Sequence, residues 1–205
     1  GDFYDYLPID KNHFGLVIAD ASGKGMPAAL LISQIQAILK SEVGHGNSIR
    51  QTIASLNKHL KQYSSAQNFA TLFYGIVDLQ AGILEYANAG HNYPILMRKN
   101  GKGEILQTTG PALGILQNSD HETASIRLRT GDNLLLYTDG VTETMNTEKA
   151  EYGEMHLQDV FEHNRSSSAQ AILDAIIEDL SDFGAADSSQ DDRTMVVLKV
   201  FGEHG

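Results

Sequence analysis

The chain has 205 residues, 41% of them hydrophobic, which is enough to bury one core, so we expect a single domain over 1–205. Acidic residues outnumber basic ones by 26 to 15, and the net charge of −11 disfavours nucleic acid or an anionic membrane as the partner. Cysteine is absent, which excludes disulfides, thiolate metal sites and cysteine-based phosphatases. No apolar run approaches the ~20 residues that cross a bilayer, so the expected location is the cytoplasm.

The first third of the chain predicts a buried strand followed by two helices. The strand is the apolar run 13–20, HFGLVIAD, which ends at an acidic residue before a Ser-Gly-Lys-Gly turn. Helical spacing of leucine and isoleucine follows over 26–43, and Pro27 lies near the start, where a missing N–H costs nothing. A second helix is expected over 48–62, with Ser48 as its cap.

The remainder of the chain predicts several strands and two more helices. The strand segments are rich in aromatic and β-branched residues, and their short connections imply antiparallel pairing. Runs of strands interleaved with paired helices favour an α+β sandwich over a doubly wound parallel sheet. We expect strands at 69–78, 83–89, 94–98, 122–128, 133–138 and 194–201, helices at 155–163 and 168–183, a turn at 99–103 and an acidic loop at 184–192.

Acidic residues border three of the apolar strands. Asp20 follows LVIA, Asp139 follows LLLYT, and Asp191 and Asp192 precede TMVVL. For any one of these sites a simple Asp-Gly turn is an equally good interpretation, but strand ends in one layer cluster, so we expect the carboxylates to converge. Converging carboxylates repel one another and are tolerated mainly where divalent cations neutralise them. Oxygen ligands favour Mg²⁺ or Mn²⁺ over zinc.

Other catalytic motifs lack residues that their chemistry requires. The segment 22–25, SGKG, lacks the Walker spacing, because Ile18 stands where the first glycine belongs and Gly25 stands where Ser or Thr belongs. An aspartyl nucleophile would need a second aspartate at Tyr137. The chain contains no G-x-S-x-G elbow and no H-E-x-x-H. His91, in Ala-Gly-His-Asn, is more typical of a structural loop histidine than of a substrate ligand.

Six motifs in one order carry a family resemblance that covers essentially the whole chain. Together they resemble the PPM family of metal-dependent serine/threonine phosphatases (protein phosphatase 2C-like), and more narrowly its bacterial SpoIIE-like branch. The resemblance implies an αββα four-layer sandwich, with two antiparallel sheets flanked by helices and a two-metal site at one edge. The motifs are GDFYD (1–5), IADASGKGMPAAL (18–30), FATLFYGIVD (69–78), YANAGHNYPIL (86–96), LLLYTDGVTE (134–143) and DDRTMVVL (191–198).

The resemblance also implies the cofactors and the site residues. Two Mn²⁺ or Mg²⁺ ions would be bound, with Asp20 bridging them and Asp5 supporting the loop. A bridging water would attack phosphorus in line, without a covalent phosphoenzyme. The implied catalytic residues are Asp2, Asp20, Asp139 and Asp191, and the implied metal ligands are these four carboxylates, the Ala21 backbone carbonyl, and Asp192 as the alternative to Asp191.

Two positions depart from the family pattern. Eukaryotic relatives carry a histidine two places after the bridging aspartate, where it serves as general acid, whereas this chain has Ser22. The leaving group would then be protonated by water or not at all. Ala21 stands where glycine or valine is usual, which a backbone carbonyl ligand tolerates.

The implied substrate is a phosphoserine or phosphothreonine on an anti-anti-sigma (STAS) protein in a bacterial partner-switching pathway. By the same resemblance, the helices at 26–43 and 48–62 would respond to an upstream regulatory domain or to a second subunit of a homodimer, although their apolar faces are also typical of ordinary core packing. The chain begins inside a motif, so we expect it to be a trimmed portion of a longer regulatory protein. The alternative functions are a non-catalytic phosphatase fold that docks a signalling partner, and a phosphatase of small phosphoesters.

Overall fold

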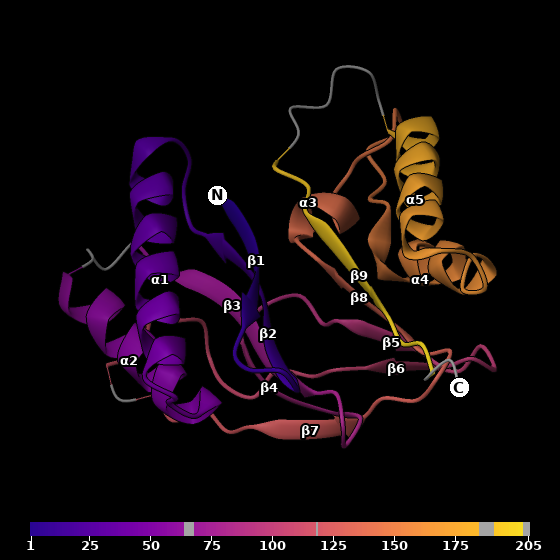
Figure 1. Cartoon of the computed structure of the whole chain (residues 1–205). Coiled ribbons are helices and arrows are strands. Elements are labelled where there is room, and N and C mark those ends of the chain that lie inside the picture. The colour runs from indigo at the N-terminus through magenta and orange to yellow at the C-terminus, as the bar shows by residue number, and fades with distance from the viewer. Residues whose placement is uncertain (64–67, 118, 185–190, 203–205) are drawn as a thin grey trace. The chain divides into compact units, whose positions relative to one another are not determined.

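The computed structural model describes residues 1–63, 68–117, 119–184 and 191–202, which form two compact units. Unit 1 comprises Gly1–His91 and Gln107–Arg127, and unit 2 comprises Asn92–Leu106 and Leu128–Gly205. Each unit contains one antiparallel sheet with its own helices (Figure 1). The prediction of an α+β protein with two antiparallel sheets is therefore confirmed, while the single domain over 1–205 stays a prediction.

Unit 1 is built on a five-stranded sheet in the order β1-β2-β3-β4-β7, in which every neighbouring pair is antiparallel. The sequence did not predict its edge strand β1, because this strand has no apolar run: Tyr4 and Tyr6 are 63% and 58% exposed. The other four strands match the predicted segments within two residues at each end. The strands are β1 Asp2–Pro8, β2 His13–Ala21, β3 Ala70–Asp78, β4 Ile83–Ala89 and β7 Ala124–Arg127.

Two helices, α1 (Met26–Gly44) and α2 (Ile49–Tyr63), pack over one face of this sheet (Figure 1). The predicted cap of α2 is confirmed, since the Ser48 N–H donates to Gln51 Oε1 at 2.9 Å and the Gln51 N–H donates to Ser48 Oγ at 3.4 Å. This reciprocal pair is a capping box, which satisfies backbone donors that the first helical turn leaves open. The core under α1 is formed by Ala28, Leu31, Ile35 and Leu39, which are buried against Val17, Ala19, Ala21 and Tyr74.

Unit 2 is built on a four-stranded sheet in the order β6-β5-β8-β9, with α4 and α5 packed over one face (Figure 1). The sequence missed β6, which is only three residues long and partly exposed, and the short helix α3. The predicted turn precedes β6, where the Arg98 N–H donates to the Lys102 carbonyl at 2.9 Å. The elements are β5 Ile95–Met97, β6 Gly103–Ile105, β8 Asn133–Tyr137, α3 Asp139–Thr142, α4 Gly153–His163, α5 Ala169–Phe183 and β9 Met195–Lys199.

No described helix combines the length and the apolar character that a membrane span requires. Residues 185–190 of the acidic loop expected at 184–192 lie outside the described residues.

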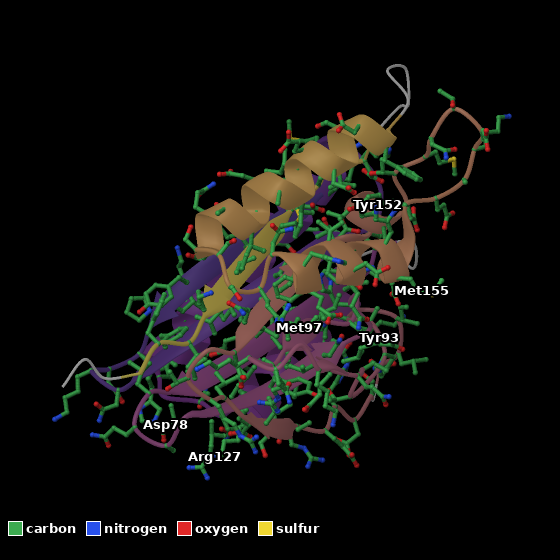
Figure 2. The ribbon with its side chains drawn as sticks, turned by 90° about the vertical axis from the view of Figure 1, so that its right-hand side faces the viewer. Asp78, Tyr93, Met97, Arg127, Tyr152 and Met155 are labelled. Atoms are coloured by element: carbon green, nitrogen blue, oxygen red, sulfur yellow. The ribbon has the colours of Figure 1, made fainter. Side chains whose placement is uncertain are left out.

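His13, Asp10 and Asp78 form an ionic cluster that connects the β1–β2 turn to the end of β3. It lies at the end of the sheet where Figure 2 labels Asp78 and Arg127. His13 Nδ1 lies 3.0 Å from the Asp10 carboxylate, and His13 Nε2 lies 3.6 Å from Asp78 Oδ2. The hydrogen bond from Asp10 raises the pKa of His13 above its usual 6.5. The pKa values of Asp10 and Asp78 are lowered, chiefly by backbone hydrogen bonds and by His13.

These shifts predict a pH-dependent contribution of His13 to stability. Because the folded-state pKa is raised, the contribution is complete below the unfolded-state value of 6.5 and is lost as the pH rises through the folded-state value. We expect His13→Gln to lower the urea midpoint at pH values below 6.5, and to lower it less in alkaline buffer. Urea titrations of both proteins across this range measure the difference. An equal difference at all pH values would show that packing, not charge, is involved.

Candidate metal centre

Asp2 and Asp20 stand directly opposite each other on β1 and β2. The next strand places Thr71 opposite Asp20 on its other side. Side chains at directly opposed positions share one face of a sheet, with Cβ atoms about 5 Å apart, and like charges there repel. The pair is therefore a feature that a bound cation would stabilise.

Gly1 allows two oxygen atoms to approach its backbone closely beside this pair. A Cβ atom on Gly1 would lie 2.7 Å from Asp20 Oδ1 and 2.7 Å from the Ala21 carbonyl oxygen, so both oxygens border the same volume. The Ala21 N–H donates to the Gly1 carbonyl at 3.2 Å, which holds the two backbones together. Carboxylate and carbonyl oxygens are donors that Mg²⁺ and Mn²⁺ accept. The donor set in unit 1 thus fits the ligands that the family resemblance implies.

The loop after β2 is held by backbone and side-chain hydrogen bonds. The Ser22 N–H donates to the Phe69 carbonyl at 2.9 Å, and Ser22 Oγ accepts from the Phe69 N–H at 2.9 Å. Ser22 therefore fixes the loop to the chain that precedes β3. Asp5 lies 3.2 Å from Lys40 Nζ, a contact that ties β1 to α1, while its support of the loop stays a prediction.

His91 is buried, with 2% of its surface exposed, and its contacts are typical of a structural residue. Its Nδ1 lies 2.8 Å from Thr71 Oγ1, and its backbone N–H donates to Asn88 Oδ1 at 2.8 Å. The Asn88 amide in turn donates to the His91 carbonyl at 3.1 Å. His91 thus supports Thr71, the residue opposite Asp20.

In unit 2, Asp139 begins α3 directly after β8. Backbone contacts bring the second acidic segment to the same place, because the Thr138 N–H donates to the Thr194 carbonyl at 3.1 Å and the Thr194 N–H donates to Thr138 Oγ1 at 3.0 Å. Gly140 allows the closest approach: a Cβ there would overlap the carbonyl oxygen of Asp192. The backbone of residues 191–192 therefore passes directly beside the start of α3.

Glu143 reveals the electrostatic character of this region. Burial, followed by the charges of Asp139, Glu151 and Asp191, raises its pKa above the usual 4.5. Burial is the larger cause, and the three neighbouring carboxylates add a negative charge that a cation would neutralise. Asp191 contributes to the shift, while the choice between Asp191 and Asp192 as a metal ligand stays open. The sequence analysis overlooked Glu143, although its spacing of four from Asp139 would have indicated proximity at a helical turn.

The reason given for convergence of the aspartates was wrong. Asp20 belongs to the five-stranded sheet, whereas Asp139 follows a strand of the four-stranded sheet, so these acids do not lie at strand ends of one layer. Within residues 1–63, 68–117, 119–184 and 191–202, no three side chains of His, Asp or Glu form a group that could hold a metal ion by themselves. The structure brings together Asp2 with Asp20 and Ala21, and Asp139 with 191–192, while a metal centre common to all of them stays a prediction.

Comparison with known proteins gives a consistent result. The family described as Stage II sporulation protein E (SpoIIE) matches residues 10–201. Phosphoserine phosphatase RsbU of Bacillus subtilis (strain 168) is 34% identical over 203 residues, which are 97% of this chain and 59% of RsbU. Protein IcfG of Synechocystis sp. is 29% identical over 97% of this chain and 35% of its own length. The chain thus spans about three fifths of RsbU and about one third of IcfG.

Solved structures with the same fold include two PP2C phosphatase domains. The PP2C domain of SpoIIE from Bacillus subtilis, solved with a fragment of its regulatory domain, has a TM-score of 0.87 at 21% identity and covers 100% of this chain and 58% of that one. The SiaA-PP2C domain of Pseudomonas aeruginosa has a TM-score of 0.86 at 18% identity, and covers 97% and 80%. RsbX in complex with magnesium has a TM-score of 0.65 at 18% identity, and covers 96% and 85%.

Proposed function

The chain belongs to the stage II sporulation protein E (SpoIIE) family, and from this premise we propose that it is a metal-dependent protein phosphatase domain that hydrolyses phosphoserine or phosphothreonine. The observation that carries the proposal is the convergence of Asp20 Oδ1 and the Ala21 carbonyl on the space beside Gly1. The opposed carboxylates of Asp2 and Asp20 add a pair of oxygen donors that a divalent cation would neutralise, a role that a docking module does not need.

The proposed ligands of two Mn²⁺ or Mg²⁺ ions are Asp2, Asp20, the Ala21 carbonyl, Asp139 and Asp191. The structure of RsbX with magnesium supports the choice of cation. When bound, such ions supply an activated water and neutralise charge on the phosphoryl oxygens. The chain itself positions the ligands: the β1–β2 pairing sets Asp2 opposite Asp20, and the close contact at Gly140 holds the backbone of 191–192 beside the start of α3.

The proposed substrate is a phosphorylated anti-anti-sigma (STAS) protein in a partner-switching pathway. The similarity to the phosphoserine phosphatases RsbU and RsbP supports a phosphoserine protein as the substrate class. The PP2C domain of SpoIIE was solved with a fragment of its regulatory domain, which supports control of this chain by such a domain, and a second subunit is the alternative. The competing proposal, a fold that docks a partner without turnover, differs in requiring no metal.

Removal of metal tests the proposal. We expect a chelator to reduce hydrolysis of a phosphoserine protein to the background rate, and added Mn²⁺ to restore it, because the nucleophile depends on the cation. Calorimetric titration with Mn²⁺ and Mg²⁺ measures binding independently. No binding of either ion at millimolar concentration, together with tight binding of the phosphoprotein, would support the docking module instead. Faster turnover of an aryl phosphate than of the phosphoprotein would indicate a phosphatase of small phosphoesters.

A further inference from the structure

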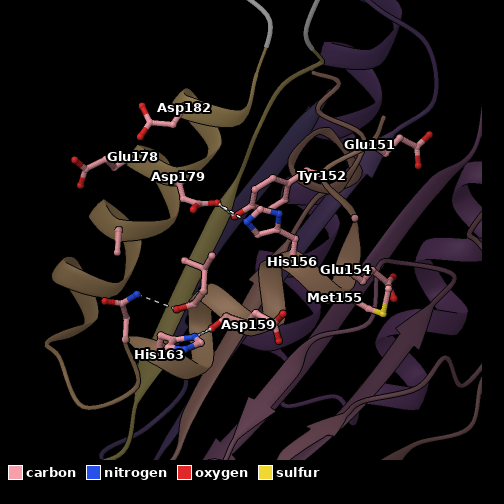
Figure 3. A pocket seen from close by; sticks show the side chains of 14 residues that line it. Glu151, Tyr152, Glu154, Met155, His156, Asp159, His163, Glu178, Asp179 and Asp182 are labelled. Atoms are coloured by element: carbon pink, nitrogen blue, oxygen red, sulfur yellow. Dashed lines mark hydrogen bonds and ion pairs between the residues drawn. The ribbon is translucent and has the colours of Figure 1, made fainter. Parts of the chain in front are cut away.

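Unit 2 contains a groove between α4 and α5 with a volume of about 1060 Å³ (Figure 3). Its walls are the facing stripes of the two helices, spaced three and four residues apart, so it follows the helix pair along its length. We call it the α4–α5 groove. The charged and aromatic residues that line it include Glu151, Tyr152, Glu154, His156, Asp159, Glu178, Asp179 and Asp182.

The α4–α5 groove carries six carboxylates, and no lysine or arginine is among the described residues that line it. Asp179 is held in place, since its Oδ2 accepts from the Tyr152 hydroxyl at 2.7 Å and lies 2.9 Å from His156 Nε2. Glu178 and Asp182 are exposed and lie one turn apart on α5. Their spacing along the wall suits two cationic side chains of one bound segment.

The base of the groove is aromatic and already ordered. The rings of Tyr152 and His156 are stacked with centroids 4.4 Å apart, and Phe183 packs edge-on against both at 5.3 and 5.7 Å. Met155, at the start of α4, is 84% exposed (Figures 2 and 3). Lysine and arginine bury their aliphatic stems on such surfaces while their charged heads reach nearby carboxylates.

We propose that the α4–α5 groove docks a lysine- and arginine-rich segment of a partner protein. The charge of the walls is complementary to such a segment and repels an acidic one, and the groove is large enough for several side chains. A lone divalent cation fits less well, because no group of three His, Asp or Glu side chains in the described part of the chain could hold one. The proposal concerns binding and does not depend on catalysis.

The test uses the full chain and a fluorescent octapeptide of alternating arginine and serine. We expect the peptide to bind, and the double variant Glu178→Gln/Asp182→Asn to bind about tenfold more weakly, equivalent to about 1.4 kcal/mol, because two exposed charge pairs are lost. Fluorescence anisotropy at two salt concentrations gives the dissociation constants. Amide chemical shifts should change along α4 and α5, and hydrolysis of an aryl phosphate should be unaffected.

The matched control is Glu85→Gln/Glu122→Gln, which changes the net charge by the same amount at exposed positions of unit 1. Unchanged peptide binding by this control would support the α4–α5 groove as the binding site. Equal weakening in both double variants would show attraction by overall charge and overturn the proposal, as would the absence of peptide binding. Displacement of the peptide by stoichiometric Mn²⁺, with shifts confined to the groove, would also overturn it in favour of a cation site.

Discussion

Asp20→Asn is expected to lower kcat/KM for phosphoprotein hydrolysis by at least about 10³-fold, equivalent to roughly 4 kcal/mol of transition-state stabilisation. In the proposed mechanism this carboxylate would be a metal ligand, and a neutral amide oxygen is a much weaker one. Initial rates at saturating Mn²⁺ measure the effect. Survival of activity in both Asp20→Asn and Asp139→Asn would refute the two-metal scheme.

The stability of Asp20→Asn separates a ligand from a structural carboxylate. Without metal, the variant loses one of two like charges at opposed positions, so it should unfold at the same temperature as the wild type or at a higher one. With Mn²⁺, only the wild type should gain stability, because a ligand that binds the folded state raises its free energy of unfolding. Thermal unfolding with and without Mn²⁺ distinguishes these outcomes.

Asp78→Asn is the matched control for this substitution. Asp78 ends β3 opposite His13, whereas Asp20 lies seven residues further along β2, or roughly 23 Å at the usual strand rise. An asparagine can still accept the hydrogen bonds that the Gln80 and Ala81 N–H groups donate. This control should keep full activity. A comparable loss of activity would mean that altered folding, not metal binding, explains both variants.

Gly140→Ala is expected to lower stability and to disturb the proposed metal ligands of unit 2. The new Cβ would overlap the Asp192 carbonyl oxygen and lie 3.1 Å from its carbonyl carbon, and these backbone atoms cannot rotate away. Overpacking of this kind costs about 1–3 kcal/mol. The forced separation also moves residues 191–192 away from Asp139. We therefore expect a lower thermal midpoint and weaker Mn²⁺ binding, measured by calorimetry.

Gly44→Ala is the control for the alanine substitution itself. Gly44 lies at the end of α1, and a Cβ there would meet nothing within 4 Å. This change should leave Mn²⁺ binding intact and stabilise the fold by about 0.4–1 kcal/mol. If Gly140→Ala unfolds at the wild-type temperature and binds Mn²⁺ equally well, the close approach at Gly140 does not organise the site.

The sequence predicted the elements whose apolar pattern is strong. The run 13–20 is buried along nearly its whole length, and 26–43 has one buried helical face. Both elements appear within one residue of their expected ends. The elements that it missed have no such pattern. β1 is a half-exposed edge strand, and β6 and α3 are three and four residues long, so tertiary pairing determines them.

The candidate site was predictable only in part. Local sequence placed Asp20 and Asp139 after buried strands, but it could not show that these strands belong to different sheets. The approach of 191–192 to Gly140 is a contact between segments some fifty residues apart, for which local patterns carry no signal. The convergence of Asp20 and Ala21 beside Gly1 depends on the β1–β2 register, which requires the undetected strand β1.

The edge position of β1 affects which part of the sheet unfolds locally first. An edge strand is hydrogen-bonded to a neighbouring strand on one side only, here to β2, and such strands open at a lower free-energy cost than central ones. A cation shared by Asp2 and Asp20 would link β1 to β2 and stabilise their pairing. Ion binding at the proposed site and separation of β1 from β2 are then coupled equilibria. A bound ion favours the paired strands, and separation of the strands releases the ion.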